Sequence, residues 1–310
     1  MYYSLASRFR GTLIGAVLAQ NQANQEKDIC NTIVASCESL IALGKFDFED
    51  WSERQHMELL LKQPTYQVLE TAILATLPLA LFFHENPVKL RHCLLDLGRI
   101  WGDDLIVRDS TLAVSFAVTL AFTEQLTPTM LIPQLVSFIG ETTTDLPQKL
   151  LKVNELLEQR VSLQQAKSEF SKYEIASNVV AMGFYSFLAT LEDFRLSILL
   201  GHQNGIHTQM VSAIAGALSG AYNSTAGIPI PWQIEYSYSK SSITGQNTFR
   251  EMVRLADGLF ATWSGLYNSQ PQASQGENTY FEPKLPLCQA TYPFYVYTSP
   301  RIIGGGKGKG

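Results

Sequence analysis

The stretch GTLIGAVLA at residues 11–19 places a small residue at every fourth position, at Gly11, Gly15 and Ala19. Small residues at this spacing lie on one face of a helix and let a neighbouring helix approach closely. The stretch IAGALSGAY at residues 214–222 has a similar pattern. Both stretches therefore predict closely packed helices, of the kind that gathers backbone and short side chains around one site.

Helical periodicity continues through most of the chain, because apolar residues recur three and four positions apart. The predicted helices cover residues 5–20, 31–43, 68–83, 89–100, 112–126, 130–139, 147–158, 163–170, 175–188, 194–200, 211–222 and 247–267. Residues 71–83 and 213–221 are apolar almost all round, which predicts central helices. Residues 227–231 are predicted as a break, and residues 236–242 as a serine-rich loop rather than a strand. Residues 1–268 are thus expected to form one all-α domain.

The composition excludes several classes of protein. Of the 310 residues, 46% are hydrophobic and only 16% are charged, and the formal net charge is -5. So few charges indicate that much of the chain is buried or bound to something, since soluble domains typically have about 25%. An acidic balance argues against a nucleic-acid partner, which would need a basic surface. The apolar content excludes disorder along the whole chain.

Cysteine usage and apolar runs bear on the compartment. The four cysteines, Cys30, Cys37, Cys93 and Cys288, form no C-x-x-C motif, and buried free thiols in a reducing cytoplasm are expected. The longest apolar run, residues 71–83, is short for a membrane span and contains Pro78, so no span is predicted. Arg8 and Arg10 before the apolar run at residues 11–19 leave a secretory signal as the less favoured alternative.

Residues 269–310 differ from the rest in composition. The segment has five prolines and a Gly- and Lys-containing end, yet it is rich in aromatic residues. These aromatic residues are Tyr280, Phe281, Tyr292, Phe294, Tyr295 and Tyr297. A solvated linker would not have this aromatic content, so we expect an extended tail that packs on its own domain or on a protein partner.

The helical segments together resemble the ADP-ribosylglycohydrolase family, which includes the dinitrogenase-reductase-activating glycohydrolases. RFRGTLIGAVLA at residues 8–19 is similar to the family's first helix, with its R-x-x-G-x-x-x-G run. Residues 31–50, 72–95, 178–188, 205–232 and 254–263 resemble later helices in the family's order. The resemblance covers residues 5–268 and implies an orthogonal multi-helix bundle around a central cleft.

The resemblance also implies a chemistry, cleavage of a glycosidic bond at the ribose of ADP-ribose with two Mg²⁺ ions. Mg²⁺ prefers oxygen ligands, and a close pair of ions needs several carboxylates to offset their repulsion. Where the family has Gly-Asp, this sequence has Ala19 and Gln20. Where the family has T-D-D-T, it has Ile29, Cys30, Asn31 and Thr32. Where the family has D-x-D-T, it has His207, Thr208, Gln209 and Met210. At the metal-binding Asp positions the chain therefore has Cys30, Asn31, His207 and Gln209, and the family's Mg²⁺ is predicted to be absent.

Two uses of these positions stay open. Cys30 and His207, with Asp28 or His202, are ligand types that a softer ion such as Zn²⁺ prefers, although structural polar residues are the favoured interpretation. The loop of His202, Gln203, Asn204 and Gly205 precedes a helix start, where a phosphate of a nucleotide-like small molecule could bind; an ordinary turn is the alternative. Asp103 and Asp104, in the loop that borders the family's cleft, are interpreted as helix caps.

Three hypotheses on function follow. The favoured one is a non-catalytic relative of the family, with no catalytic residue, that binds a protein partner or a small ligand in a regulatory or assembly role. The second is an active hydrolase whose rearranged site uses no metal or a single soft metal. The third is a structural protein of a larger assembly that depends on residues 269–310.

Overall fold

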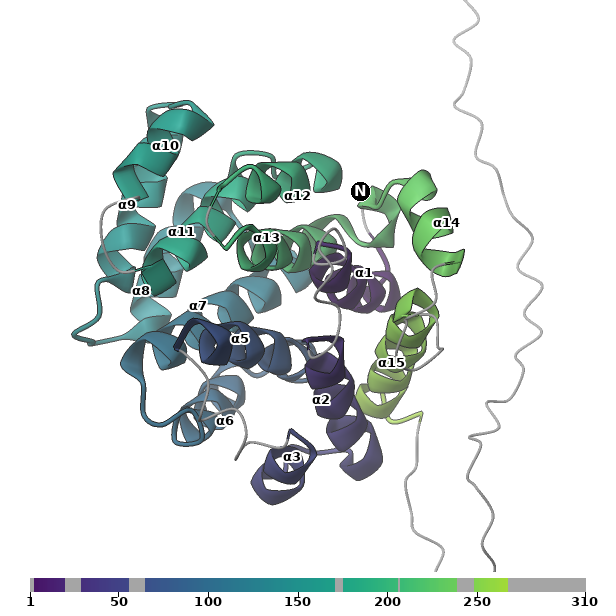
Figure 1. Cartoon of the computed structure of the whole chain (residues 1–310). Helices are drawn as coiled ribbons and strands as arrows, with labels where there is room; N and C mark the ends of the chain where they lie inside the picture. Colours follow the sequence, from purple (N-terminus) through teal and green to yellow (C-terminus); the bar gives the residue numbers. More distant parts are fainter. Residues whose placement is uncertain are drawn as a thin grey trace, which may run out of the picture. The chain divides into compact units, whose positions relative to one another are not determined.

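The computed structural model describes residues 3–19, 29–55, 65–170, 175–205, 207–238 and 248–266. All of them belong to the first of two units, Met1–Ser269 and Gln270–Gly310. The described residues form fourteen α-helices and one short 3₁₀ helix, with no strand among them (Figure 1). The prediction of an all-α, multi-helix bundle is confirmed. The tail aromatics from Tyr280 to Tyr297 and Cys288 lie outside the described residues, so their predicted roles stay predictions.

The helices follow one another with short connections. The first half contains α1 (Leu5–Leu18), α2 (Ile29–Leu43), α3 (Phe48–Arg54), α5 (Thr65–Phe82), α6 (Pro87–Gly98), α7 (Leu105–Phe122) and α8 (Pro128–Ile139). The second half contains α9 (Leu146–Glu158), α10 (Leu163–Phe170), α11 (Ile175–Leu188), α12 (Phe194–His202), α13 (Thr208–Asn223), η1 (Thr225–Gly227), α14 (Ile230–Tyr238) and α15 (Thr248–Trp263).

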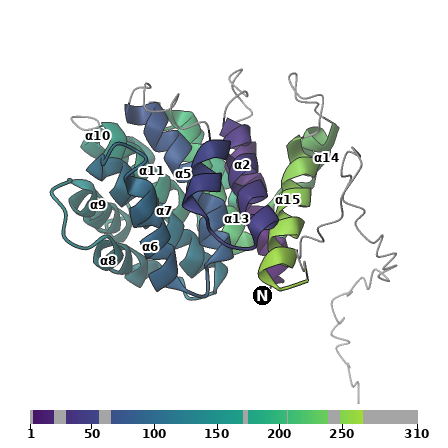
Figure 2. The same ribbon diagram turned by 90° about the horizontal axis from the view of Figure 1, so that it is seen from below.

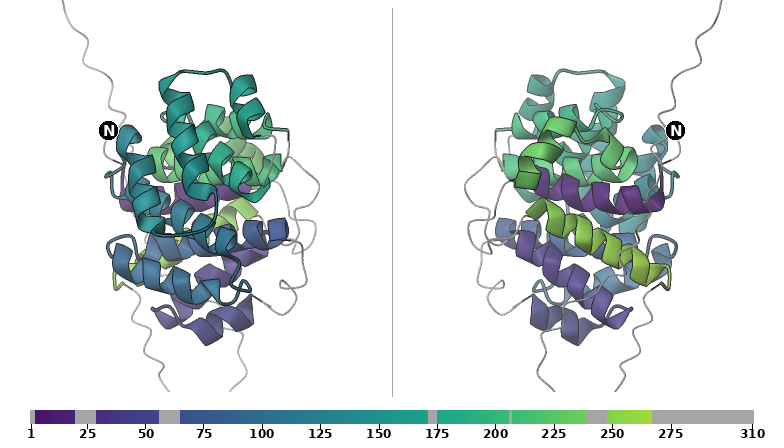
Figure 3. Two further views of the ribbon diagram at one scale, coloured as in Figure 1. Left: turned by 90° about the vertical axis from the view of Figure 1, so that its left-hand side faces the viewer. Right: turned by 90° about the vertical axis from the view of Figure 1, so that its right-hand side faces the viewer.

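The two small-residue stretches pack against each other. The carbonyl oxygen of Gly216 lies where a Cβ of Gly15 would be, and Gly11 and Gly220 approach each other in the same way. Gly11 pairs with Gly220 and Gly15 with Gly216, so the residue numbers rise along α1 while they fall along α13, and the two helices are antiparallel. Their backbones touch without intervening side chains, so the small residues of both helices serve one interface. The right-hand view of Figure 3 shows α1 between α13 and α15.

The central position of α5, α7 and α13 follows from their composition. From Ala72 to Phe82 every residue of α5 is buried, as is every residue of α13 from Met210 to Ala221. This confirms the prediction of central helices. Both α5 and α7 are long and apolar enough to cross a membrane, but most of each is buried inside the bundle, as in the core of a soluble protein. The prediction of no membrane span therefore stays a prediction.

Arg8 fixes the start of α1 to the ends of two core helices. Its buried guanidinium donates hydrogen bonds to the carbonyl oxygens of Ala121 (2.7 Å) and Ala221 (3.3 Å), at the last turns of α7 and α13. It also pairs with Glu124 at 2.7 Å. Carbonyls at a helix C-terminus have no partner within the helix, and a cation there also offsets the negative end of the helix dipole. Arg8 thus holds α1, α7 and α13 in one register.

Aromatic rings hold α15 against α1 at the same end. His84 lies 4.7 Å from Trp263 and 4.6 Å from Phe122 between ring centroids, and Phe9 lies 5.5 Å from Phe260. Burial lowers the pKa of His84. The neutral imidazole donates from Nδ1 to the carbonyl oxygen of Leu81 at 2.6 Å. Figure 2 shows α15 beside α2 on this side of the bundle.

Several predicted element boundaries were wrong. The predicted break at residues 227–231 leads into α14, which includes Tyr236 and begins beside Pro231 in its first turn, where proline is tolerated. Helix α5 begins at Thr65, three residues before the predicted start, and it contains Pro78, as the predicted helix did. Helix α7 begins at Leu105, seven residues before the predicted start, since Asp104 caps it.

We predict that Gly15→Ala destabilises the protein, whereas Gly98→Ala does not. A methyl group at Gly15 overlaps the Gly216 carbonyl, and at Gly98 it meets only the flexible Arg108 side chain at 3.6 Å. Overpacking of this kind costs about 1–3 kcal/mol, while alanine gains up to about 1 kcal/mol of helix propensity. Urea unfolding of both variants measures the difference. Equal stability of the two variants would contradict the role of the α1–α13 contact.

Candidate functional site

Four helices begin at the end of the bundle where α1 finishes. The Gly15–Gly216 contact makes α1 and α13 antiparallel, so the last turn of α1 lies beside the first turns of α13. Tyr66 in the first turn of α5 packs on His207, which precedes α13, with ring centroids 4.9 Å apart. Short turns on either side of α6 reverse the chain twice, so α7 runs parallel to α5. Thr119 near the end of α7 accordingly donates a hydrogen bond to the Ala80 carbonyl near the end of α5.

Helix α2 begins at the same end. Ile41, near its last residue, lies 3.0 Å from a Cβ built on Gly258 of α15. The neighbouring Asp257 pairs with Arg10 near the start of α1 at 2.6 Å. The last turn of α2 therefore lies at the same end of the bundle as the start of α1, and the first turn of α2 lies at the same end as the end of α1. The N-termini of α2, α5, α7 and α13 all add partial positive charge at this end, offset at α7 by the Asp104 carboxylate that caps it.

The first turn of α2 holds the predicted Cys30, Asn31 and Thr32. Cys30 is half-buried, Asn31 is exposed and Thr32 is buried. Gln55 at the end of α3 donates a hydrogen bond to the Thr32 carbonyl at 2.9 Å, which fixes this turn. Ala19 is buried at the end of α1. Gln20 and Asp28 lie outside the described residues.

His207 occupies the position before α13 with an unusual backbone. Its φ of 47° and ψ of 41° are left-handed, and its side chain forms no hydrogen bond that caps the helix. The amide groups of the first turn thus lack the side-chain acceptor that most helix starts have. Gln209 follows in this turn and is half-buried. The arrangement presents backbone donors at the positive end of α13, the geometry that accepts an anion.

The predicted loop lies next to this turn. Gly201 packs against Ser212 of α13, with a Cβ of Gly201 only 2.7 Å from the Ser212 Cα, so the end of α12 is beside the start of α13. His202 ends α12, and within the described part of the chain its buried Nε2 has no hydrogen-bond partner. Burial lowers the pKa of His202. Gln203, Asn204 and Gly205 form the turn that follows, and Gly205 has a φ of +94°.

No metal-type cluster is found among the described residues: no three His, Cys, Asp or Glu side chains there lie close enough together to hold an ion. The predicted soft-metal set of Cys30, His207, Asp28 and His202 includes one residue, Asp28, that is not described. The hypothesis of a single soft metal is therefore untested.

Glu70 is a residue that the sequence patterns did not single out. It lies in the second turn of α5 and is the only charged residue of this 18-residue helix. Burial raises the pKa of its carboxyl to about 7. A lone acidic residue within a helix as apolar as α5 is the sequence signal that could have identified it. A carboxyl that titrates near neutral pH is suited to proton transfer.

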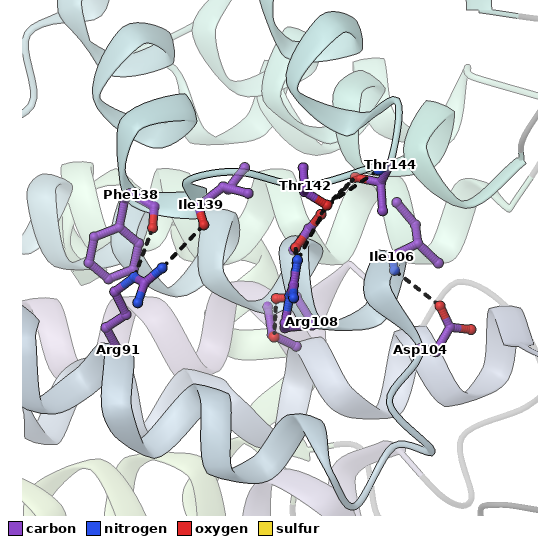
Figure 4. A network of polar contacts seen from close by, with 10 residues as sticks. Arg91, Asp104, Ile106, Arg108, Phe138, Ile139, Thr142 and Thr144 are labelled. Atoms are coloured by element: carbon purple, nitrogen blue, oxygen red, sulfur yellow. Dashed lines mark hydrogen bonds and ion pairs between the residues drawn. The ribbon is translucent and has the colours of Figure 1, made fainter.

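The acidic residues at the start of α7 have structural roles. Asp104 accepts a hydrogen bond from the Ile106 amide at 3.0 Å and caps the helix, as predicted. Buried Asp109 accepts from Thr142 and Thr144, each at 2.6 Å, and pairs with Arg108 at 2.7 Å (Figure 4). The carboxylate is fully satisfied, so this network attaches the loop between α8 and α9 to α7 rather than serving as a base.

A family model described as ADP-ribosylglycohydrolase matches residues 5–268. No curated protein matches the chain.

We predict that Glu70→Gln changes the pH dependence of stability. The Glu70 carboxyl binds its proton more tightly in the folded protein than in the unfolded chain. Its contribution to the free energy of unfolding is therefore complete below about pH 4.5 and is lost as pH rises to about 7. The neutral amide avoids this loss. Relative to the native protein, the variant should gain about 1–2 kcal/mol between pH 5 and pH 8, less than the full shift implies because the side chain is partly solvated.

Thermal unfolding at both pH values measures this gain. The control is Glu169→Gln, which neutralises an exposed carboxylate on α10 and should show no pH-dependent difference. A gain of the same size in both variants would refute the assignment to Glu70.

Proposed function

The chain belongs to the ADP-ribosylglycohydrolase family, and from this premise we propose that it is a non-catalytic member that binds a nucleotide-like ligand without Mg²⁺. The observation that carries the proposal is the donor set at the bundle end where α2 and α13 begin. By the resemblance described under Sequence analysis, the family's metal-binding Asp positions correspond to Cys30, Asn31, His207 and Gln209. A thiol, two amides and an imidazole stand where four carboxylates are expected.

Electrostatics at this end favour an anion over a cation. Two Mg²⁺ ions bring four positive charges, and the N-termini of four helices add partial positive charge of the same sign. Coulomb repulsion on this scale needs several carboxylates in reach, and the substituted positions provide none. The donor set thus does not fit paired Mg²⁺. A phosphate is attracted by the helix N-termini directly and needs no ion to mediate it.

The start of α13 provides the groups that would hold such a ligand. Uncapped amides of its first turn and the Gln209 side chain can donate to phosphate oxygens. The ring pair of Tyr66 and His207 offers an aromatic surface to an adenine or ribose. The turn from Gln203 to Gly205 lies next to these groups, and a glycine there leaves its backbone open to a ligand.

A regulatory or assembly role would use this binding to control contact with a protein partner. The aromatic residues between Tyr280 and Tyr297 are the proposed partner-binding segment, since aromatic side chains are enriched at interface hot spots. Cys37 and Cys93 are buried free thiols, which supports the proposed location in the reducing cytoplasm.

Glu70 supports a second candidate, an active hydrolase with a metal-free, rearranged site. Its carboxyl has a pKa of about 7, so it could donate a proton to a leaving group or remove one from water near neutral pH. This candidate requires that Glu70→Gln abolish turnover. The non-catalytic proposal requires that there be no turnover to abolish.

We predict that ADP-ribose binds the full-length protein equally well in MgCl₂ and in EDTA, because helix dipoles and backbone donors need no metal. Isothermal titration calorimetry measures both affinities. Incubation with ADP-ribosylated arginine should release no ADP-ribose in either buffer. Affinity that depends on Mg²⁺, or Mg²⁺-dependent release, would refute the proposal, and metal-independent release that Glu70→Gln abolishes would establish the second candidate.

A variant pair locates the site. Gln209→Ala should weaken binding about fivefold to tenfold, the effect of losing one hydrogen bond to a charged group. Lys152→Ala is the control, since Lys152 forms only a surface pair with Glu155 on α9. Equal affinities of the two variants would place the ligand elsewhere.

A further inference from the structure

A groove on the side of the bundle is separate from the site at its end. Helices α6 and α8 form its walls and Phe116, three turns into α7, contributes to its floor. The cavity volume is about 700 Å³, within the range of small-molecule sites. Its lining consists of Pro87, Val88, Arg91, His92, Phe116, Met130, Pro133, Gln134, Ser137 and Phe138.

The apolar lining is aromatic. Phe116 and Phe138 stack with ring centroids 4.0 Å apart and an angle of 7° between their planes. Pro87, Pro133 and Met130 extend this surface. At the rim, Val88 is 69% and Met130 is 51% exposed, so the surface is open to a ligand. Flat rings and a thioether pack best against another flat, apolar ring.

The charge in the groove has one sign. Among the lining residues Arg91 carries a permanent charge, and it forms no ion pair within the described part of the chain. The Arg91 guanidinium donates to the carbonyl oxygens of Phe138 (3.1 Å) and Ile139 (3.3 Å), as Figure 4 shows. These bonds hold the cation at the end of α8, where the negative end of the helix dipole offsets part of its charge but no carboxylate pairs with it. The groove therefore complements an anion.

Gln134 adds a polar requirement. Its Oε1 is buried, and in the described residues it has no hydrogen-bond donor. A buried acceptor without a donor costs about 1–3 kcal/mol, so a ligand that supplies a donor recovers this energy. The acceptor belongs to the same lining as the Phe116–Phe138 pair and Arg91.

We propose that this groove is a binding site for a small aromatic carboxylate with a hydroxyl or amino group. The ring would pack against the outer face of the Phe116–Phe138 stack, the carboxylate would face Arg91, and the donor would reach Gln134 Oε1. The chemical class follows from three separate features of the lining: its stacked aromatic rings, its positive charge and its unsatisfied acceptor. The site is independent of the proposed nucleotide ligand.

Three naphthalene probes test the class, with the full-length protein and naphthyl fluorescence as the signal. The probe 6-hydroxy-2-naphthoate has the ring, the carboxylate and the donor, 2-naphthoate lacks the donor, and 2-naphthol lacks the carboxylate. We expect 6-hydroxy-2-naphthoate to bind with a dissociation constant below about 100 μM. Each of the other two should bind about fivefold more weakly, the value of one hydrogen bond or one partly solvated charge pair.

Variants place the probe in the groove. Val88→Glu puts a carboxylate at the exposed rim and should weaken 6-hydroxy-2-naphthoate binding at least about fivefold. Val88→Lys removes the same apolar side chain with the opposite charge and should bind at least as well as the native protein. Gln134→Leu should remove the preference for 6-hydroxy-2-naphthoate over 2-naphthoate, and it should not reduce stability, since it removes an unsatisfied acceptor.

No binding of 6-hydroxy-2-naphthoate up to 1 mM, or equal binding to Val88→Glu and Val88→Lys, would overturn the proposal. Equal binding of all three probes would show that the groove is an unspecific apolar surface, and this result would also overturn the proposal. ADP-ribose titration of Val88→Glu keeps the two proposals apart, because that ligand's affinity should be unchanged whatever the naphthalene probes show.

Discussion

The backbones of α1 and α13 touch at two levels, and the position of every group at the candidate site depends on that contact. Gly11 faces Gly220 and Gly15 faces Gly216, with no side chain between them. One helix therefore ends beside the first turn of the other. A larger residue at any of these four positions would separate the helices by more than an ångström and move the start of α13 away from α5. The candidate site thus takes its geometry from a contact between glycine backbones, with the Arg8 hydrogen bond to the Ala221 carbonyl at its other end.

Because of this geometry, the residues at the start of α2 and α13 determine which charges the helix N-termini can bind. The N-termini of four helices at one end create a positive field that the fold cannot avoid. A relative with carboxylates at the positions of Cys30, Asn31, His207 and Gln209 can balance that field and two further cations. This chain has no carboxylate at those four positions. In the proposed function the field therefore acts on the negative charge of a ligand, and a phosphate group takes the place proposed for the metal ions in such a relative.

The sequence predicted the all-α class, the central helices and the caps, because these depend on local periodicity and on single residues such as Asp104. It did not predict that the two glycine stretches are partners, since the pattern of one helix carries no information on which neighbour it meets. Helix α14 was missed because Pro231 reads as a break unless it falls in a first turn. The place of Glu70 as the only charged residue of an apolar helix is a signal in the sequence, but its raised pKa comes from the helices packed around it.

Burial at this end of the bundle acts on two titratable groups, His202 and Glu70. It disfavours the protonated form of His202 and the ionised form of Glu70, so it lowers the pKa of the histidine and raises that of the carboxyl to about 7. Below about pH 7 the Glu70 carboxyl is mostly neutral and adds no repulsion toward a phosphate. Above that value it becomes a negative charge in the second turn of α5, and the helix dipoles must overcome it. The same desolvation thus serves both proposed uses of this end: it gives Glu70 the pKa of a proton donor near neutral pH, and it removes a negative charge that would oppose a bound phosphate.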